Sequence, residues 1–263
     1  MIKKAAEIIE RADCLIIGAS NGFSISEGLN IFADNESFRR IFGDYREKYG
    51  LRSIIHGCMG VWPDINEKWD FWKRLVENYC FSYEGSHLMN NLKEIIGKKD
   101  YFIVTTNGES HFQLAGLDAA GIYQIEGSFL ELQCSRPCCS RIYSIADYMK
   151  VDKMPICPEC GEPMAFHVEA DGSFIKNDNQ MRAFEEFVEK NKDKGIAILE
   201  LGIGSRNTLI KEPLMRLCAR LENASYIAVN KGELYIPEYI ENKAVGLDGD
   251  LNTIVESIRE TLI

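Results

Sequence analysis

The feature that most constrains the fold is a series of short, apolar, β-rich segments followed by turns rich in Gly, Ser and Asn. The strands expected from it are Cys14–Ala19, Tyr101–Thr106, Ile196–Leu201 and Tyr226–Asn230, with shorter candidates at Ile122–Ile125 and Lys243–Leu247. Helical patterns lie between several of them, at Ile2–Ala12, Met89–Ile96, Gln180–Lys190, Thr208–Leu221 and Thr253–Leu262. This alternation predicts an α/β protein with a Rossmann-like, doubly wound parallel sheet, which binds ligands at the carboxyl ends of its strands.

Two insertions interrupt the alternation. The first, residues 30–88, contains all three tryptophans and is expected to be helical, with its aromatic side chains on a buried face. The second, residues 133–177, contains a cluster of cysteines. We therefore predict a large Rossmann-like domain from residues 1–29, 89–132 and 178–263, and a small domain formed by the two insertions. A chain of 263 residues is long enough to bury a large core.

The charge and the cysteines limit the partners and the compartment. The net charge of −10 argues against broad nucleic-acid binding, because an acidic surface repels a phosphate backbone. The apolar run after the first helix, at Cys14–Ala19, is far too short to span a bilayer, so we expect no membrane association and a cytoplasmic location. In that compartment nine cysteines favour thiols or metal ligands over disulfides.

Five of the cysteines lie within 27 residues of one another and predict a metal site. Cys134 and Cys138 form a first pair, and Cys157 and Cys160 form a second, about 18 residues later. Two such pairs are typical of a structural zinc ribbon, in which four thiolates fill the tetrahedral shell. Cys139 is an alternative to Cys138, which we favour because a proline precedes it, and His167 is an alternative fourth ligand.

The turn after the first strand is rich in glycine and small polar residues. Gly18-Ala19-Ser20-Asn21-Gly22-Phe23-Ser24 follows a strand and precedes a helix-like segment, and Gly202-x-Gly204-Ser205 follows another strand. Glycine at such a junction lets backbone N–H groups approach a pyrophosphate. Each turn alone is a weak indicator, but together they predict a nucleotide site at one edge of the sheet.

These motifs resemble those of the sirtuins, in order and separation, along nearly the whole chain. The segment from Ser20 to Leu29 resembles the sirtuin GAGIS-x-x-SGI, Thr105-Thr106-Asn107-Gly108-Glu109 resembles TQNID, and Gln124-Ile125-Glu126-Gly127-Ser128 stands in the place of ELHGS. The cysteine pairs fall where sirtuins hold zinc, Leu201–Ser205 stands for the GTS segment, and Val229-Asn230 stands for the IN pair. The resemblance implies a Rossmann-like domain that binds NAD as co-substrate, a small zinc domain, and chemistry in the cleft between them.

The departures from the common sirtuin pattern narrow the expected activity. Glu126 stands where the deacylases have a catalytic His, and a carboxylate with a pKa of about 4.3 is a poorer base near neutrality than an imidazole unless burial raises it. Several phrases, including TTN, FQ-x-AG and LQCS-x-PC, resemble the macrodomain-linked class M sirtuins, which are protein mono-ADP-ribosyltransferases. The resemblance implies a protein substrate, such as a lipoylated carrier protein, and a macrodomain partner. The alternatives are an NAD-dependent lysine deacylase and a catalytically weak NAD-sensing module.

The resemblance also implies roles for individual residues. Asn107, Glu109 and Glu126 are the expected catalytic residues, and His111 is an alternative base. The expected cofactor-binding residues are Gly18, Ala19, Ser20, Asn21, Gly22, Ser24, Phe32, Thr106, Asn107, Gly202, Gly204, Ser205 and Asn230. The expected zinc ligands are Cys134, Cys138, Cys157 and Cys160.

Overall fold

The main sheet of the computed structural model, which describes residues 1–170 and 172–263, has six parallel strands in the order β3-β2-β1-β7-β8-β9. The strands are β1 (Cys14–Ala19), β2 (Asp100–Thr105), β3 (Ile122–Gln124), β7 (Ile196–Leu201), β8 (Ala224–Asn230) and β9 (Ala244–Asp248). Strand order reverses between β1 and β7, and a doubly wound sheet binds ligands at the carboxyl side of this point. The predicted doubly wound fold is thus confirmed.

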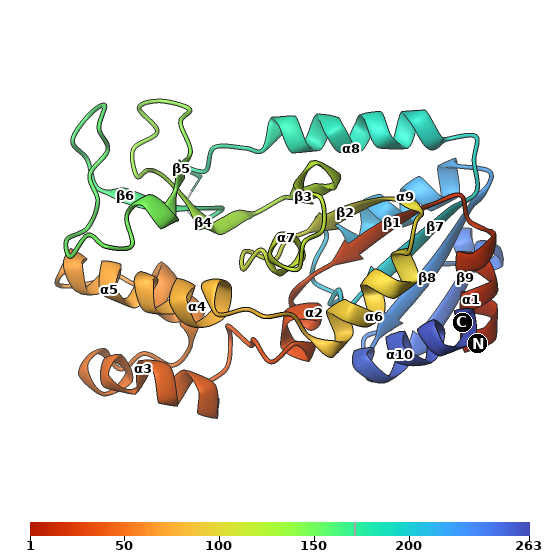
Figure 1. Ribbon diagram of the computed structural model, residues 1–263, viewed down its shortest axis with the longest axis horizontal. Coiled ribbons are helices and arrows are strands. Elements are labelled where there is room, and N and C mark those ends of the chain that lie inside the picture. The colour runs from red at the N-terminus through yellow and green to blue at the C-terminus, as the bar shows by residue number, and fades with distance from the viewer. Residues whose placement is uncertain (171) are drawn as a thin grey trace.

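Helices cover both faces of this sheet (Figure 1). On one face, α1 (Ile2–Arg11), α6 (His87–Ile96) and α10 (Leu251–Leu262) pack on inward-facing residues such as Leu15 and Ile17 of β1. On the other face, α8 (Asp178–Asn191) and α9 (Lys211–Arg220) pack on the alternate residues, such as Ile16. Because successive strand residues point to opposite faces, both sets are apolar, and strands buried on both sides read as continuous apolar runs.

A second, smaller sheet is antiparallel and lies beside the first (Figure 1). It consists of β4 (Gly127–Cys134), β5 (Tyr143–Ser144) and β6 (Met164–Val168), in the order β5-β4-β6. The helices α3 (Glu36–Tyr49), α4 (Ile54–Met59) and α5 (Ile65–Val76) and the π-helix η1 (Glu77–Phe81) share one hydrophobic cluster with it. Trp69 and Trp72 are buried in this cluster, as predicted, and the Trp72 ring stacks on Phe166 of β6 with 4.2 Å between centroids.

The short helices connect these layers. They are α2 (Asn21–Ser26), α7 (His111–Leu114) and the 3₁₀ turns η2 (Ala119–Gly121), η3 (Ile145–Asp147) and η4 (Glu238–Lys243). Within residues 1–170 and 172–263, every helix is too short or too polar to cross a membrane.

The sequence placed the six parallel strands within about two residues of their observed ends, but β4 and its sheet were not predicted. The segment 89–132, expected to end inside the large domain, runs into β4, which pairs with β6 of the second sheet. We therefore propose that this segment of the large domain ends just before Gly127. The division itself stays a proposal.

Candidate functional site

A cleft of about 930 Å³ opens at the carboxyl ends of β1, β2, β7 and β8 and is bounded on its other side by β4, β6 and α4. Most of the predicted cofactor-binding and catalytic residues line it. They are Ser20, Asn21, Gly22, Ser24, Phe32, Thr106, Glu109, Glu126, Gly202, Gly204 and Asn230. This volume lies within the range of about 300–1,000 Å³ that is usual for small-molecule sites.

Two glycine turns meet backbone to backbone at the base of the cleft. The N–H of Gly22 donates to the carbonyl oxygen of Gly202 over 3.0 Å. A Cβ on Gly22 would lie 2.4 Å from that oxygen, and a Cβ on Gly202 would lie 2.6 Å from the carbonyl carbon of Gly22. Gly202 also has a φ of +64°, in the left-handed region that favours glycine. Both glycines are therefore required for the two turns to form one continuous backbone surface.

Polar side chains that follow β1, β2 and β7 form hydrogen bonds with one another at the carboxyl ends of these strands. Ser20, after β1, and Thr106, after β2, share a hydrogen bond of 2.9 Å between their hydroxyl groups. The side-chain amide of Asn207 donates to both hydroxyls, over 3.0 and 3.1 Å. The Asn207 carbonyl oxygen accepts from the backbone N–H groups of Leu209 and Ile210, so this side chain also fixes the turn that leads into α9.

Asn207 was missed by the sequence analysis. Its signal was an asparagine between a glycine-rich turn and a helical pattern, a position at which asparagine commonly bonds its own backbone. Arg206, Glu169 and Glu233 also line the cleft and were not predicted.

Asn107 follows Thr106 in the chain, and its side-chain amide donates to the carbonyl oxygen of Ser20, a residue that lines the cleft, over 3.1 Å. Its own side-chain oxygen is buried and has no hydrogen-bond partner among the described residues. Buried acceptors are nearly always paired in native proteins, so an orphaned one beside a cleft indicates a place for a ligand group or a water.

Glu126 lines the wall of the cleft opposite the glycine turns, between β3 and β4. Glu169 lines the same wall, and its backbone N–H donates to the Glu126 carbonyl oxygen over 3.0 Å. Burial, and then the negative charge of Glu169, raise the pKa of the Glu126 carboxyl above its usual value. Both influences make Glu126 a stronger base than an exposed glutamate, closer to what proton transfer near neutrality requires.

Glu109 forms part of the floor of the cleft and is almost fully buried. One of its oxygens accepts from the Ser24 hydroxyl over 2.7 Å. Burial raises the pKa of the Glu109 carboxyl, while the neighbouring charge of His111 and the bond from Ser24 oppose that rise. His111 itself does not line the cleft, and both its ring nitrogens are bonded, to Glu27 and to the Tyr79 carbonyl. The structure therefore argues against His111 as the alternative base.

Four of the predicted cofactor or catalytic residues do not line the cleft: Gly18, Ala19, Asn107 and Ser205. Gly18 lies inside β1, where a Cβ would be 2.6 Å from Leu214 of α9, so this glycine allows helix packing. Ala19 is buried in the core, and Ser205 is exposed, its backbone N–H donating to the Glu233 carboxylate over 2.7 Å.

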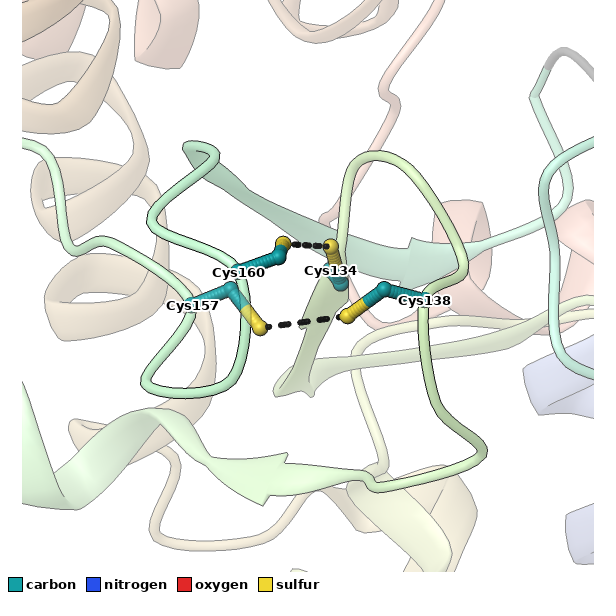
Figure 2. Close-up of side chains that lie close together, drawn as sticks. All are labelled: Cys134, Cys138, Cys157 and Cys160. Atoms are coloured by element: carbon teal, nitrogen blue, oxygen red, sulfur yellow. Dashed lines mark hydrogen bonds between the residues drawn. The ribbon is translucent and has the colours of Figure 1, made fainter.

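The four predicted zinc ligands come together at the end of β4 (Figure 2). Their sulfur atoms lie within 4.8 Å of one another, with 3.5 Å between Cys134 and Cys160 and 3.6 Å between Cys138 and Cys157. Zn–S bonds of about 2.3 Å in a tetrahedron place the sulfurs roughly 3.8 Å apart. The cluster therefore fits a structural zinc ion, with no position left for water.

The conformation of the local backbone helps these four cysteine side chains to converge. Gly161, with a φ of +77°, lets the chain turn so that its N–H donates to the Cys157 carbonyl over 2.8 Å. Desolvation raises the pKa of the Cys157 thiol, but backbone N–H groups of Glu159 and Cys160 lower it to about 7, which favours a thiolate ligand.

The two alternative ligands lie outside this cluster. Cys139 is half-buried and does not belong to it. His167 is buried on β6, where its ring nitrogens contact the Glu131 carboxylate and the Ile175 carbonyl, each over 2.7 Å. The geometry therefore favours Cys138 and excludes His167.

The chain was compared with protein-family models and with curated proteins. No family model matches the chain. A protein ADP-ribosyltransferase of Staphylococcus aureus (strain Mu50) is 28% identical over 274 aligned positions, which cover 96% of this chain and 86% of that protein.

Two solved structures resemble the whole chain. One, described as "Structural Basis for the Mechanism and Regulation of Sir2 Enzymes", has a TM-score of 0.61 and 18% identity, covering 99% of this chain and 96% of that one. The other, "The Structural basis for Sirtuin Substrate affinity", has a TM-score of 0.59 and 17% identity, covering 99% and 97%. The chain therefore has the fold of these two solved structures along nearly its whole length.

Proposed function

We propose that this protein is an NAD-consuming protein mono-ADP-ribosyltransferase. The observation that carries the proposal is a cleft that is lined both by the glycine turns after β1 and β7 and by Glu126. The likeness to an ADP-ribosyltransferase along nearly the whole chain supports transfer of ADP-ribose over the deacylation expected of a sirtuin with a catalytic histidine.

The residues present fit NAD as the co-substrate. The close approach of Gly22 and Gly202 leaves bare backbone at the base of the cleft, as a pyrophosphate requires. The orphaned side-chain oxygen of Asn107 offers an acceptor for a hydroxyl group or for an ordered water. When bound, NAD supplies the ADP-ribosyl group, with nicotinamide as the leaving group.

Three side chains have proposed roles in that transfer. Asn107 holds a ribose hydroxyl or an ordered water, and Glu109 holds the carboxamide of the nicotinamide. Glu126, whose pKa burial and Glu169 raise, stabilises positive charge that develops on the ribose or takes a proton from the acceptor side chain. The target protein supplies the acceptor, so no nucleophile of this chain is needed.

The proposed target is a lipoylated carrier protein, and the proposed partner is a macrodomain protein. This finer assignment rests on the class M resemblance of the motifs. We also propose that the protein acts in the cytoplasm, which is supported by the nine cysteines being either thiols or metal ligands among the described residues. The zinc ion has a structural role, because four thiolates complete its coordination shell.

The proposed function is tested by incubating the purified protein with NAD labelled in its adenylate group and a lysate of its own source. We expect label on a discrete protein, identified by gel and mass spectrometry, and loss of that label with Glu126→Ala. The Glu10→Ala variant, which removes an exposed carboxylate on α1, is the matched control and should label normally.

The other outcomes separate the alternatives. Released nicotinamide with the label in O-acyl-ADP-ribose would overturn the transferase in favour of a lysine deacylase. Binding of NAD without any turnover would overturn both the transferase and the deacylase assignments in favour of an NAD-sensing module.

A further inference from the structure

A buried group of charged side chains lies beneath the floor of the cleft. It joins Glu27 at the end of α2, His111 at the start of α7, and Glu109, which alone of the three lines the cleft. One ligand atom of each lies within 4.8 Å of the others, and the side chains of Glu27 and His111 are 0% and 5% exposed. Two carboxylates are buried here beside one imidazole.

The contacts of His111 indicate which protons its ring carries. Its Nε2 lies 2.7 Å from the carbonyl oxygen of Tyr79, which only accepts, so Nε2 must be protonated. Its Nδ1 lies 2.7 Å from a Glu27 oxygen, and an ionised carboxylate also only accepts. The other Glu27 oxygen already accepts from the hydroxyls of Tyr83 and Ser86, over 2.6 and 2.5 Å, which favours the ionised form. The geometry thus assigns His111 as an imidazolium.

The groups around the ring support this charge. The Tyr83 ring stacks on His111 with 3.8 Å between centroids, and the π-helix η1 presents the Tyr79 carbonyl to it. Burial lowers the pKa of His111, but the bond to Glu27 and the charge of Glu109 outweigh it and raise the pKa above its usual value. Cys80, also on η1, faces Glu109 as a neutral thiol, since burial raises its pKa.

The backbone holds these side chains in place at some cost. Ser110, between Glu109 and His111, has a φ of +62°, the only left-handed non-glycine among the described residues. Such a conformation is strained and persists only where surrounding contacts fix it. Ser110 is fixed by hydrogen bonds of its hydroxyl with Ser128, over 2.7 Å, and with the Gln124 amide, over 3.1 Å. The strained turn lets Glu109 and His111 both lie in the buried network.

We propose that the Glu27–His111 pair is a positioning device that keeps Glu109 as a carboxylate at the floor of the cleft, ready to accept a hydrogen bond from the carboxamide of NAD. The inference rests on the proposed function for its ligand. Without the imidazolium, two carboxylates would lie buried close together, and Glu109 would take up a proton as the pH falls toward neutrality. A protonated Glu109 would give up its negative charge and change its hydrogen bond to the carboxamide.

The test uses His111→Asn, which keeps a donor near Nδ1, and His111→Gln, which keeps one near Nε2. In both variants we expect the affinity for NAD, measured by calorimetry, to fall more than in the wild type between pH 8 and pH 6, by up to about tenfold, because loss of the imidazolium raises the pKa of Glu109. The wild type should change by less than about twofold under the same conditions. His87→Asn, at an exposed histidine paired with Glu256, is the matched control.

A second measurement needs no NAD and reads the charge of His111 in the wild-type protein. Nitrogen-15 spectra of the histidine rings should show both nitrogens of His111 protonated at pH 7, with the signal assigned by its absence from either variant. A neutral ring at pH 7, or variants whose NAD affinity depends on pH as in the wild type, would overturn the inference. Failure of the wild type to bind NAD would instead overturn the proposed function and leave the ring spectrum to decide the charge of His111.

Discussion

Glu126 differs from an exposed glutamate because it is partly buried and lies on the same wall of the cleft as Glu169. Its place in the chain could be predicted from the motif around it, but its ionisation could not. Glu169 is 43 residues away and reaches it only because the end of β6 lies beside the start of β4. The contact between Glu27 and His111, 84 residues apart, was equally invisible in the sequence.

The carboxylate pair predicts a change in the pH dependence of the reaction. A base must be deprotonated, so activity should rise with pH through the pKa of Glu126. Because the charge of Glu169 raises that pKa, Glu169→Gln should lower it and move the acid limb of the rate profile to lower pH. Nicotinamide release across pH 5–9 measures the shift. An unchanged acid limb, matching that of the exposed-site variant Glu10→Gln, would show that Glu169 does not control the base.

At the scale of elements, the parallel strands were predictable because burial on both faces leaves each as a short, continuous apolar run. The antiparallel sheet was not, because β4 lacks a regular alternation of buried and exposed residues. Its burial pattern has three buried residues at each end, and its register with β6 shifts between Ser128 and Leu132. A bulge of this kind removes the two-residue period on which strand prediction depends.

The zinc cluster is the element-scale feature whose loss should matter most for stability. Cys157→Ser should abolish bound zinc, about one ion per chain in the wild type, and lower the melting temperature by roughly 5 °C or more, because metal binding contributes to folding. Metal analysis and thermal melting measure both effects. Cys139→Ser is the matched control, because Cys139 lies outside the cluster and its variant should keep the ion. Retention of zinc and fold by Cys157→Ser would contradict the four-cysteine assignment.

At the scale of the whole molecule, the cleft exists because two insertions fold into a second layer beside the carboxyl edge of the main sheet (Figure 1). Residues from both insertions share one hydrophobic cluster, including Phe42 of α3, Trp72 of α5 and Phe166 of β6. The sequence indicated that the two insertions together form one small domain. It could not give the side chains that meet across the cleft, because those depend on how the two layers pack.

The central claim is that this cleft binds NAD on the backbone of the two glycine turns, and a calorimetric titration of NAD tests it most directly. Gly22→Ala should weaken binding at least about tenfold, because its Cβ would lie 2.4 Å from the Gly202 carbonyl oxygen and force the turns apart. Gly43→Ala, within α3 and with open space around it, is the matched control and should bind as the wild type does. Equal affinity of the Gly22→Ala and wild-type proteins, with both folded by thermal melting, would contradict the claim.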